Sequence, residues 1–105
     1  MQLEDPVFRA LADPSRRAIF ERLTCKEAAV KDLTARFDIS QPAVSQHLAA
    51  LRSAGLVSLR RHGRLTYYRV EPDGLRPLID WIAHYQGFWL ERLVRLHALL
   101  KEMDT

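Results

Sequence analysis

Five arginines in the middle of the chain are the residues whose type and spacing say most about chemistry. The segment from Gln41 to Val70 holds no Asp, Glu or Lys, and its arginines are Arg52, Arg60, Arg61, Arg64 and Arg69. The whole chain has 16 basic and 13 acidic residues, so the residues outside this segment carry a net charge of −2 (11 basic against 13 acidic). Positive charge gathered in one segment is typical of a surface that contacts phosphate groups. The alternative is a solvated arginine face.

Hydrogen-bonding side chains lie on a predicted helix over residues 41–54, within the same segment. Val44, Leu48 and Leu51 are spaced i, i+4 and i+7, which predicts one buried stripe. Ser40 is the predicted N-cap of this helix, and Gly55 ends it. The opposite face presents small or hydrogen-bonding side chains and no acid: Gln41, Ser45, Gln46, Ala49 and Arg52.

This polar face has the chemistry that is needed to read base pairs. A Gln side chain pairs with N6 and N7 of adenine, and a Ser hydroxyl either donates or accepts. The amides at the start of the helix, with Ser40 beside them, suit a phosphate group. We therefore expect this helix to lie in the major groove of duplex DNA, against the alternative of an ordinary polar surface. For His47, packing or a phosphate contact is favoured over metal binding.

A β-hairpin is predicted directly after this helix. Residues 56–61 and 65–70 read as strands, the second rich in β-branched and aromatic residues, with a turn at 62–63. Tyr67 and Tyr68 alternate, so only one of them is expected to face the core. We expect the arginines around the turn to lie along phosphates or to enter the minor groove, and these are Arg60, Arg61 and Arg64.

The remaining elements position these two groups of side chains. Asp5-Pro6 and Asp13-Pro14 are predicted to begin two helices, a third short helix ends near Asp38, and one long helix is predicted from about residue 75 to 101. The chain is therefore predicted to be a single domain, 1–105, mostly α with a small β-hairpin in the order α-α-α-α-β-β-α. A helix, a tight turn, a helix and then an arginine-tipped hairpin are typical of a winged helix-turn-helix.

Composition excludes several other classes of protein. The sequence has no run of about 18 apolar residues that would span a membrane, and residues 1–5 show no signal-peptide pattern. Cys25 is the only cysteine, so it has no internal disulfide partner. We expect a cytoplasmic protein without a membrane partner. No spacing gathers Ser, His and Asp residues into a catalytic arrangement, so we do not expect an enzyme.

Three segments resemble the ArsR/SmtB family of bacterial repressors: 39–51 (ISQPAVSQHLAAL), 8–17 (FRALADPSRR) and 54–57 (AGLV). The resemblance covers nearly the whole chain. It implies a winged-helix homodimer joined through its first and last helices, which binds a palindromic double-stranded DNA operator and is released by a signal. The DNA-binding residues that we predict are Ser40, Gln41, Ser45, Gln46, His47, Arg52, Arg60, Arg61 and Arg64.

The last predicted helix carries more apolar residues than its own domain would cover. Leu78, Ile82, Tyr85 and Trp89 form one stripe, and further apolar residues widen it. Exposed apolar area of this size usually marks an interface. With the first helix included, the residues predicted to form the dimer interface are Phe8, Leu11, Trp81, Tyr85, Phe88, Trp89, Leu93 and Leu96.

The metal motifs of the family are altered in this sequence. Ala29 and Lys31 stand where its arsenic- and lead-type site has cysteines, and neither side chain ligates a soft cation. Asp80, His84 and His97 lack the spacing of its zinc-type site. The chain resembles the metal-free, autorepressor-like branch, so we expect no metal and no cofactor. An inducer, which the residues do not identify, is expected to be a small molecule or a protein.

Two other interpretations of the regulator stay open. One is a metal- or redox-responsive repressor with a divergent site, in which Cys25, next to Lys26, is the thiol that is oxidised or capped. The other is a winged helix that contacts only protein. The second should show an apolar or acidic recognition face, whereas the face predicted here is polar.

Overall fold

The computed structural model describes residues 5–104, which form six α-helices, a two-stranded hairpin and a short 3-10 helix. Residues 1–4, which carried most of the expectation about a signal peptide, lie outside the described residues. The elements are α1 (Pro6–Ala12), α2 (Pro14–Cys25), α3 (Val30–Phe37), α4 (Gln41–Ser53), β1 (Val57–His62), β2 (Leu65–Val70), η1 (Pro72–Leu75), α5 (Arg76–His84) and α6 (Gln86–Met103). The mostly helical class and the hairpin are confirmed.

The predicted helix starts are confirmed by their capping hydrogen bonds. The Asp13 carboxylate accepts from the backbone N–H of Arg16 at 3.1 Å, and the Ser40 hydroxyl accepts from the N–H of Ala43 at 3.2 Å. Asp5 caps α1 in the same way. In all three helices a proline follows in the first turn, where its missing N–H costs nothing. The hydrogen bond from the Arg16 amide holds the pKa of Asp13 below its usual value.

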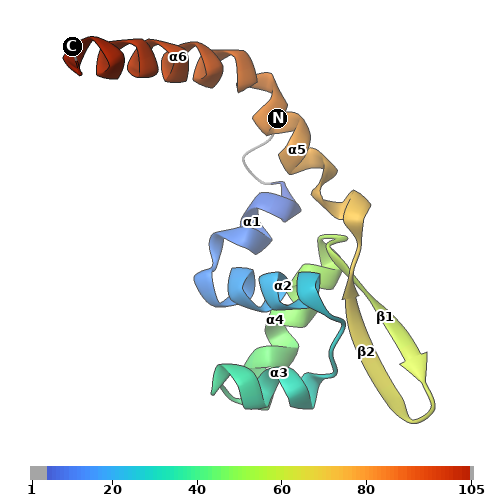
Figure 1. Ribbon diagram of the computed structural model, residues 1–105. Helices are drawn as coiled ribbons and strands as arrows, with labels where there is room; N and C mark the ends of the chain where they lie inside the picture. Colours follow the sequence, from blue (N-terminus) through green and yellow to red (C-terminus); the bar gives the residue numbers. More distant parts are fainter. Residues whose placement is uncertain (1–4, 105) are drawn as a thin grey trace.

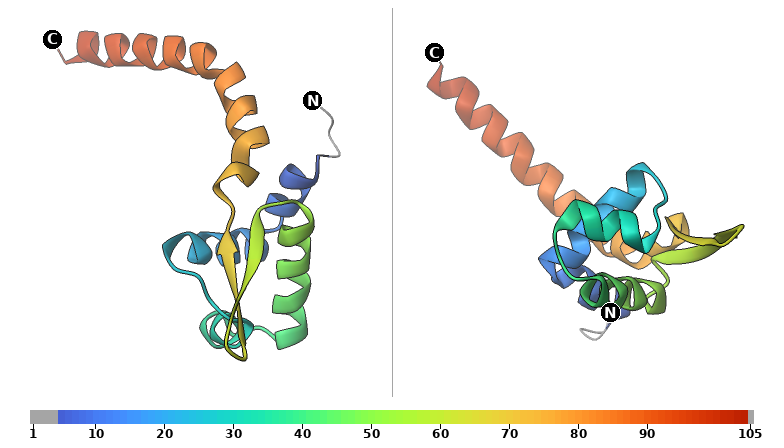
Figure 2. Two further views of the ribbon diagram at one scale, coloured as in Figure 1. Left: turned by 90° about the vertical axis from the view of Figure 1, so that its right-hand side faces the viewer. Right: turned by 90° about the horizontal axis from the view of Figure 1, so that it is seen from below.

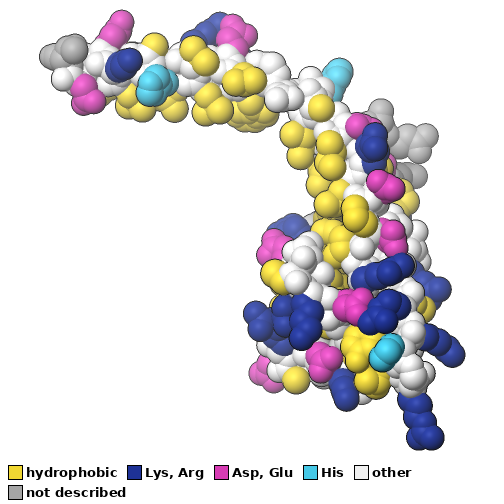
Figure 3. All heavy atoms as spheres, turned by 45° about the vertical axis from the view of Figure 1, so that its right-hand side comes forward, with side chains coloured by type: hydrophobic (Ala, Val, Ile, Leu, Met, Phe, Trp, Pro, Cys, Tyr) yellow, Lys and Arg dark blue, Asp and Glu magenta, His cyan; other side chains and the backbone are white. Residues whose placement is uncertain are grey.

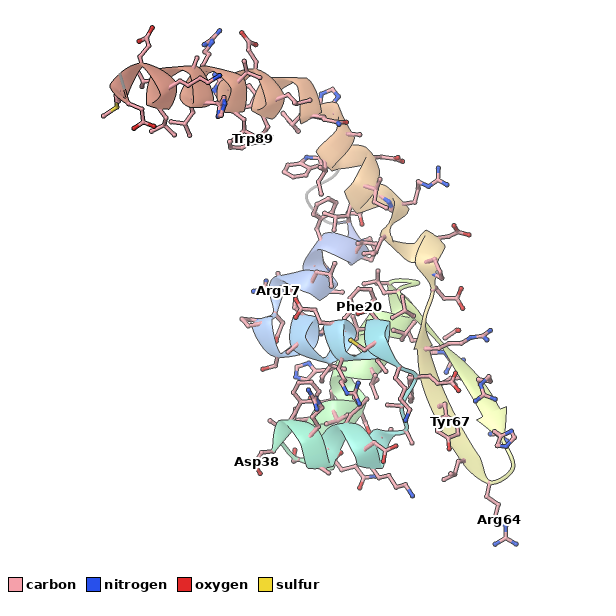
Figure 4. The ribbon with its side chains drawn as sticks, in the orientation of Figure 1. Arg17, Phe20, Asp38, Arg64, Tyr67 and Trp89 are labelled. Atoms are coloured by element: carbon pink, nitrogen blue, oxygen red, sulfur yellow. The ribbon has the colours of Figure 1, made fainter. Side chains whose placement is uncertain are left out.

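One core joins α1–α4 to the base of the hairpin. Val44, Leu48 and Leu51 are fully buried, as the spacing predicted, and Phe20 points from α2 into the same body (Figure 4). Burial of these side chains fixes which face of α4 turns outward. The core residues are Val7, Ala10, Ile19, Phe20, Leu23, Ala28, Leu33, Val44, Leu48, Leu51, Leu56 and Val57.

The hairpin is antiparallel and closes in a two-residue turn. His62 pairs with Leu65, and Gly63 has φ +63°, which is the left-handed conformation that glycine adopts without strain. Tyr68 packs against the core, whereas Tyr67 lies against Arg60, its cross-strand partner. The prediction that only one tyrosine faces the core is therefore confirmed.

The prediction of one long helix over residues 75–101 is wrong. η1 ends at Leu75, and the residues that follow are divided into α5 and α6 at Tyr85, whose backbone leaves the helical region (φ −105°, ψ 7°). The Tyr85 N–H bonds to the Ile82 carbonyl at 3.0 Å, a 3-10 interaction in place of the α-helical one. Gly87, a poor helix former, lies two residues after Tyr85 and favours the break here.

The bend at Tyr85 sends α6 away from the body (Figures 1 and 2). The radius of gyration is 18.5 Å, against about 13 Å for a compact domain of this length. Apolar side chains of α5 and α6 gather on the concave side of the bend (Figure 3). No residue of α6 is buried. Among the described helices, none has the length and apolar character needed to cross a bilayer.

Candidate nucleic-acid interface

A tight turn between α3 and α4 sets the direction of α4. α3 ends at Asp38, whose φ of 52° places it in the left-handed region that Asn and Asp tolerate best among non-glycine residues. Ile39 then packs against the core and Ser40 caps α4. The chain therefore reverses within a few residues, and the buried stripe of α4 leaves the opposite face exposed. In Figures 1 and 2, α3, the start of α4 and the tip of the hairpin lie at the end of the body that faces away from α6.

The exposed face of α4 is the polar face that the sequence predicted. Its residues are all solvent-exposed, and they are Gln41, Ser45, Gln46, Ala49 and Arg52. No acidic side chain lies on α4, so nothing on this helix repels a phosphate backbone. In the first turn, Ser40 caps the Ala43 amide and Pro42 has no N–H, so the backbone N–H groups of Ser40 and Gln41 remain for a phosphate group.

His47 differs from the other predicted DNA-binding residues. Successive helical residues are rotated by about 100°, so His47 points about 200° away from Ser45. Its ring is half-buried, and its Nδ1 atom is buried without a hydrogen-bond partner among the described residues. The geometry therefore separates His47 from the exposed face of α4.

The hairpin presents two arginines freely at its outer end. Arg61 and Arg64 are both exposed, and Arg64 extends from the tip away from the body (Figure 4). Arg69, farther from the tip, donates from Nε to the Ser58 hydroxyl at 3.3 Å. The Ser58 hydroxyl in turn donates to the Glu71 carboxylate. In Figure 3, dark-blue basic side chains project from this end of the molecule.

Arg60 is already engaged within the protein. Its Nε atom donates to the Glu27 carboxylate at 3.1 Å, and its Nη2 atom forms an ion pair with the other carboxylate oxygen. The guanidinium also lies over the Tyr67 ring, 5.4 Å from its centroid. The Arg60 hydrogen bonds lower the pKa of Glu27 below its usual value, and Glu27 raises the pKa of Arg60.

Glu27 is the residue of this region that sequence reasoning missed. It lies 33 residues before Arg60 in the chain, in the connection between α2 and α3. Sequence periodicity relates only residues within one element, so it cannot predict a contact at this separation. Glu27 and Arg60 meet because the connection between α2 and α3 pairs with the hairpin.

The residues considered for a metal-dependent site are only partly brought together. Asp80 and His84 line a cavity of about 530 Å³ together with Asp5, Trp81 and Tyr85. Within residues 5–104, no group of three or more His, Cys, Asp or Glu side chains has an arrangement that could hold a metal ion. Cys25 is exposed at the end of α2. The expectation that metals do not regulate this protein stays a prediction.

Comparison with known proteins gives one family-model match and several relatives. The model is described as a helix-turn-helix domain and matches residues 11–60. The chain is 46% identical over 96 residues to the HTH-type transcriptional regulator Rv2034 of Mycobacterium tuberculosis, covering 91% of this chain and 87% of that protein. It is 34% identical over 79 residues to the transcriptional repressor SdpR of Bacillus subtilis, covering 75% of this chain and 88% of that protein.

Solved structures share the fold as well. An ArsR family transcriptional regulator superimposes with a TM-score of 0.70 at 32% identity, covering 80% of this chain and 87% of that one. The homodimeric winged helix-turn-helix DNA-binding domain of Mb0332 from Mycobacterium bovis, a possible ArsR-family regulator, gives a TM-score of 0.64 at 34% identity. That match covers 76% of this chain and 77% of the Mb0332 fragment.

Proposed function

Because this chain belongs to the ArsR family of winged helix-turn-helix transcriptional regulators and is a DNA-binding repressor, we propose that it works as a homodimer on a palindromic operator of its own or a neighbouring operon. The observation that carries this proposal is the exposed polar face of α4, whose first turn lies at the same end of the body as the two exposed arginines of the hairpin. One recognition helix contacts few base pairs. Two helices about 34 Å apart read successive major grooves of a palindrome.

The side chains of this interface divide into two roles. On α4, Gln41, Ser45 and Gln46 contact base edges, because amide and hydroxyl groups match the donor and acceptor pattern of the major groove. The N-terminal amides beside Ser40, together with Arg52, contact phosphates. Arg61 and Arg64 on the hairpin supply further phosphate contacts. This assignment leaves out His47 and Arg60, because the first faces away from Ser45 and the second is paired with Glu27.

The apolar surface of α5 and α6 supports the second half of the proposal. Helices in proteins gain most of their stability from packing of an apolar face, yet the 18-residue helix α6 exposes Trp89, Leu93 and Leu96 by half or more. A second copy of the chain, packed into the concave side of the bend, covers this surface. The homodimeric state of the similar Mb0332 domain agrees with this arrangement.

The residues proposed for the dimer interface lie on three helices. Phe8 on α1 and Trp81 on α5 are in contact with each other, and Tyr85, Phe88, Trp89, Leu93 and Leu96 continue the exposed surface onto α6. Leu11 packs against the core instead and is only partly exposed, so only part of its side chain is available to the dimer interface.

Salt-dependent binding to generic duplex DNA tests the proposal against a winged helix that contacts only protein. A DNA-binding domain releases counterions when its arginines meet phosphates, so log Kobs falls linearly with log salt concentration. We expect such a slope for a scrambled duplex, and tighter binding to a duplex that the protein selects from a random-sequence pool. If neither duplex is bound even at low salt, the DNA-binding proposal is wrong and the winged helix that contacts only protein is favoured.

A further inference from the structure

We propose that Glu27 is a positioning residue, which fixes the arginine-tipped hairpin relative to the helix-turn-helix so that both contact one duplex. This inference rests on the proposed DNA-binding function. It concerns a residue outside the predicted interface, in the short connection between α2 and α3.

The connection is bonded to the hairpin along its free edge. The backbone N–H of Ala28 donates to the Tyr68 carbonyl at 3.1 Å, and the N–H of Tyr68 donates to the Ala28 carbonyl at 2.8 Å. β2 therefore has β1 on one side and the connection on the other. Because Arg60 belongs to β1, the ion pair from Glu27 reaches across β2 and joins all three segments.

The pair has the geometry of a specific clamp rather than of a loose surface contact. Both carboxylate oxygens of Glu27 are engaged by two nitrogens of one guanidinium, which is the bidentate arrangement that fixes direction as well as distance. The Tyr67 ring lies against the same guanidinium. The side chains of Arg60 and Glu27 are about two-thirds covered, with exposures of 38% and 32%.

The connection is also continuous with the helix-turn-helix. Ala29, two residues after Glu27, is the N-cap of α3, and its N–H donates to the Asp32 carboxylate at 3.4 Å. A displacement of the hairpin is therefore passed directly to the start of α3 and from there to α4. The spacing between a major groove and the flanking backbone is fixed in B-DNA. When α4 lies in the major groove, a displaced hairpin therefore misses the flanking phosphates, and binding is weaker.

Glu27 also neutralises the charge of Arg60, which lies farther from the turn than Arg61 and Arg64. With Arg60 paired, the phosphate contacts fall to Arg61 and Arg64, which are exposed. The two possible roles of Arg60 thus make opposite predictions. If Arg60 acts as the partner of Glu27, its loss lowers affinity for the selected duplex only. If Arg60 contacts a phosphate, its loss lowers affinity for every duplex equally and reduces the salt slope by about one unit.

The experiment measures the affinity of each variant, in the full chain, for two duplexes: one selected by the wild-type protein from a random pool and a scrambled control. We expect Glu27→Gln to lower affinity for the selected duplex by roughly tenfold. Affinity for the scrambled duplex should stay equal or rise, because a negative charge is removed. Arg60→Gln should give a similar reduction without a lower salt slope, and the double variant should be no worse than either single one.

Two variants serve as controls. Glu21→Gln removes the same charge from an exposed position on α2 and should leave the ratio of the two affinities unchanged. The exchange of charges in Glu27→Arg with Arg60→Glu keeps the net charge and should restore part of that ratio. Should Glu27→Gln fail to fold by circular dichroism, Arg60→Lys replaces it. Lys keeps the positive charge but has no guanidinium fork, and the ratio should still fall.

The proposal is overturned if Glu27→Gln strengthens binding to both duplexes equally and Arg60→Gln lowers the salt slope by about one unit. It is likewise overturned if Arg60→Lys leaves the ratio of affinities unchanged. Neither result affects the proposed DNA-binding function, which depends on α4, Arg61 and Arg64. Absence of all DNA binding in the wild-type protein would instead remove the function itself.

Discussion

The Phe8 ring on α1 meets the Trp81 ring on α5 edge to face, with 5.7 Å between their centroids and an interplanar angle of 77°. Trp81 also lies against Tyr85 at 5.2 Å, where the chain bends into α6. The first helix and the last two helices therefore share one aromatic cluster, which continues into the exposed apolar face of α6 (Figure 3). This continuity makes one interface, and not two separate ones, the simplest arrangement for a dimer.

Charges placed on α6 should separate the dimer. Leu93 and Leu96 are 60% and 51% exposed in the single chain, so their replacement by Glu leaves the fold of one chain intact. In the dimer, the two carboxylates would face an apolar partner surface, which costs several kcal/mol. We expect Leu93→Glu/Leu96→Glu to sediment as a monomer, to keep its helical circular dichroism and to bind the selected duplex far more weakly.

Lys101→Glu places a carboxylate at an exposed, already charged position near the end of the same helix and is the control, with dimerisation expected to persist. A monomeric Leu93→Glu/Leu96→Glu variant that binds the palindrome with full affinity would disprove the role of the dimer. A wild-type protein that sediments as a monomer at micromolar concentration would disprove it sooner.

The free arginines of the hairpin should supply affinity without sequence preference. We expect Arg61→Ala and Arg64→Ala to weaken binding to selected and scrambled duplexes alike. Each variant should reduce the salt slope by about one unit, because one fewer arginine then meets a phosphate. Titrations at several salt concentrations measure both effects. Lys101→Ala, with the same change of charge at the far end of α6, should leave the slope unchanged. A change of base preference with an unaltered slope would refute this assignment.

Sequence discrimination should instead depend on α4. Truncation of Ser45 or Gln46 to Ala removes hydrogen bonds to base edges while leaving the buried stripe of the helix in place. We expect each variant to lose about 1–3 kcal/mol of discrimination at particular base pairs. Affinities for a panel of single-base variants of the selected duplex measure this effect. His47→Gln provides the comparison and should leave base preference as it is; a shift in preference there, with none for Ser45 and Gln46, would reverse the assignment.

A close backbone contact should make one glycine irreplaceable. A Cβ atom on Gly74 in η1 would lie 2.2 Å from the carbonyl oxygen of Gly55 and 3.0 Å from Cα of Leu56. Backbone atoms cannot move aside as a flexible side chain does, so Gly74→Ala should lower the free energy of unfolding by about 1–3 kcal/mol. Urea denaturation measures it. Gly87→Ala, where a Cβ meets nothing within 4 Å, should be neutral or stabilising, and equal effects at both sites would contradict the contact.

Local patterns predicted most of the body. The caps at Asp13 and Ser40, the apolar stripe of α4 and the β-branched content of β2 each act over a few residues, and each appears in the structure where the sequence placed it. The exposed polar face of α4 followed from that stripe, because burying one side of a helix defines the other.

Features that depend on tertiary contacts could not be predicted in this way. The break at Tyr85 interrupts an apolar repeat that continues on both sides of it, so periodicity alone favours an unbroken helix. The pairing of Arg60 with Glu27 depends on the backbone bonds between Ala28 and Tyr68. The sequence alone therefore predicted that Arg60 contacts phosphate, whereas in the structure Arg60 is paired with Glu27.

A nuclease footprint of the wild-type protein on the DNA upstream of its own coding region tests the central claim most directly. The account predicts protection of two inverted half-sites with centres about 34 Å apart, which is one turn of the duplex. Protection should weaken steeply as salt concentration rises, and it should disappear with Leu93→Glu/Leu96→Glu. Protection of a single half-site by a monomer, or uniform protection with no preferred sequence at any salt concentration, would contradict a homodimeric repressor that reads a palindrome through α4.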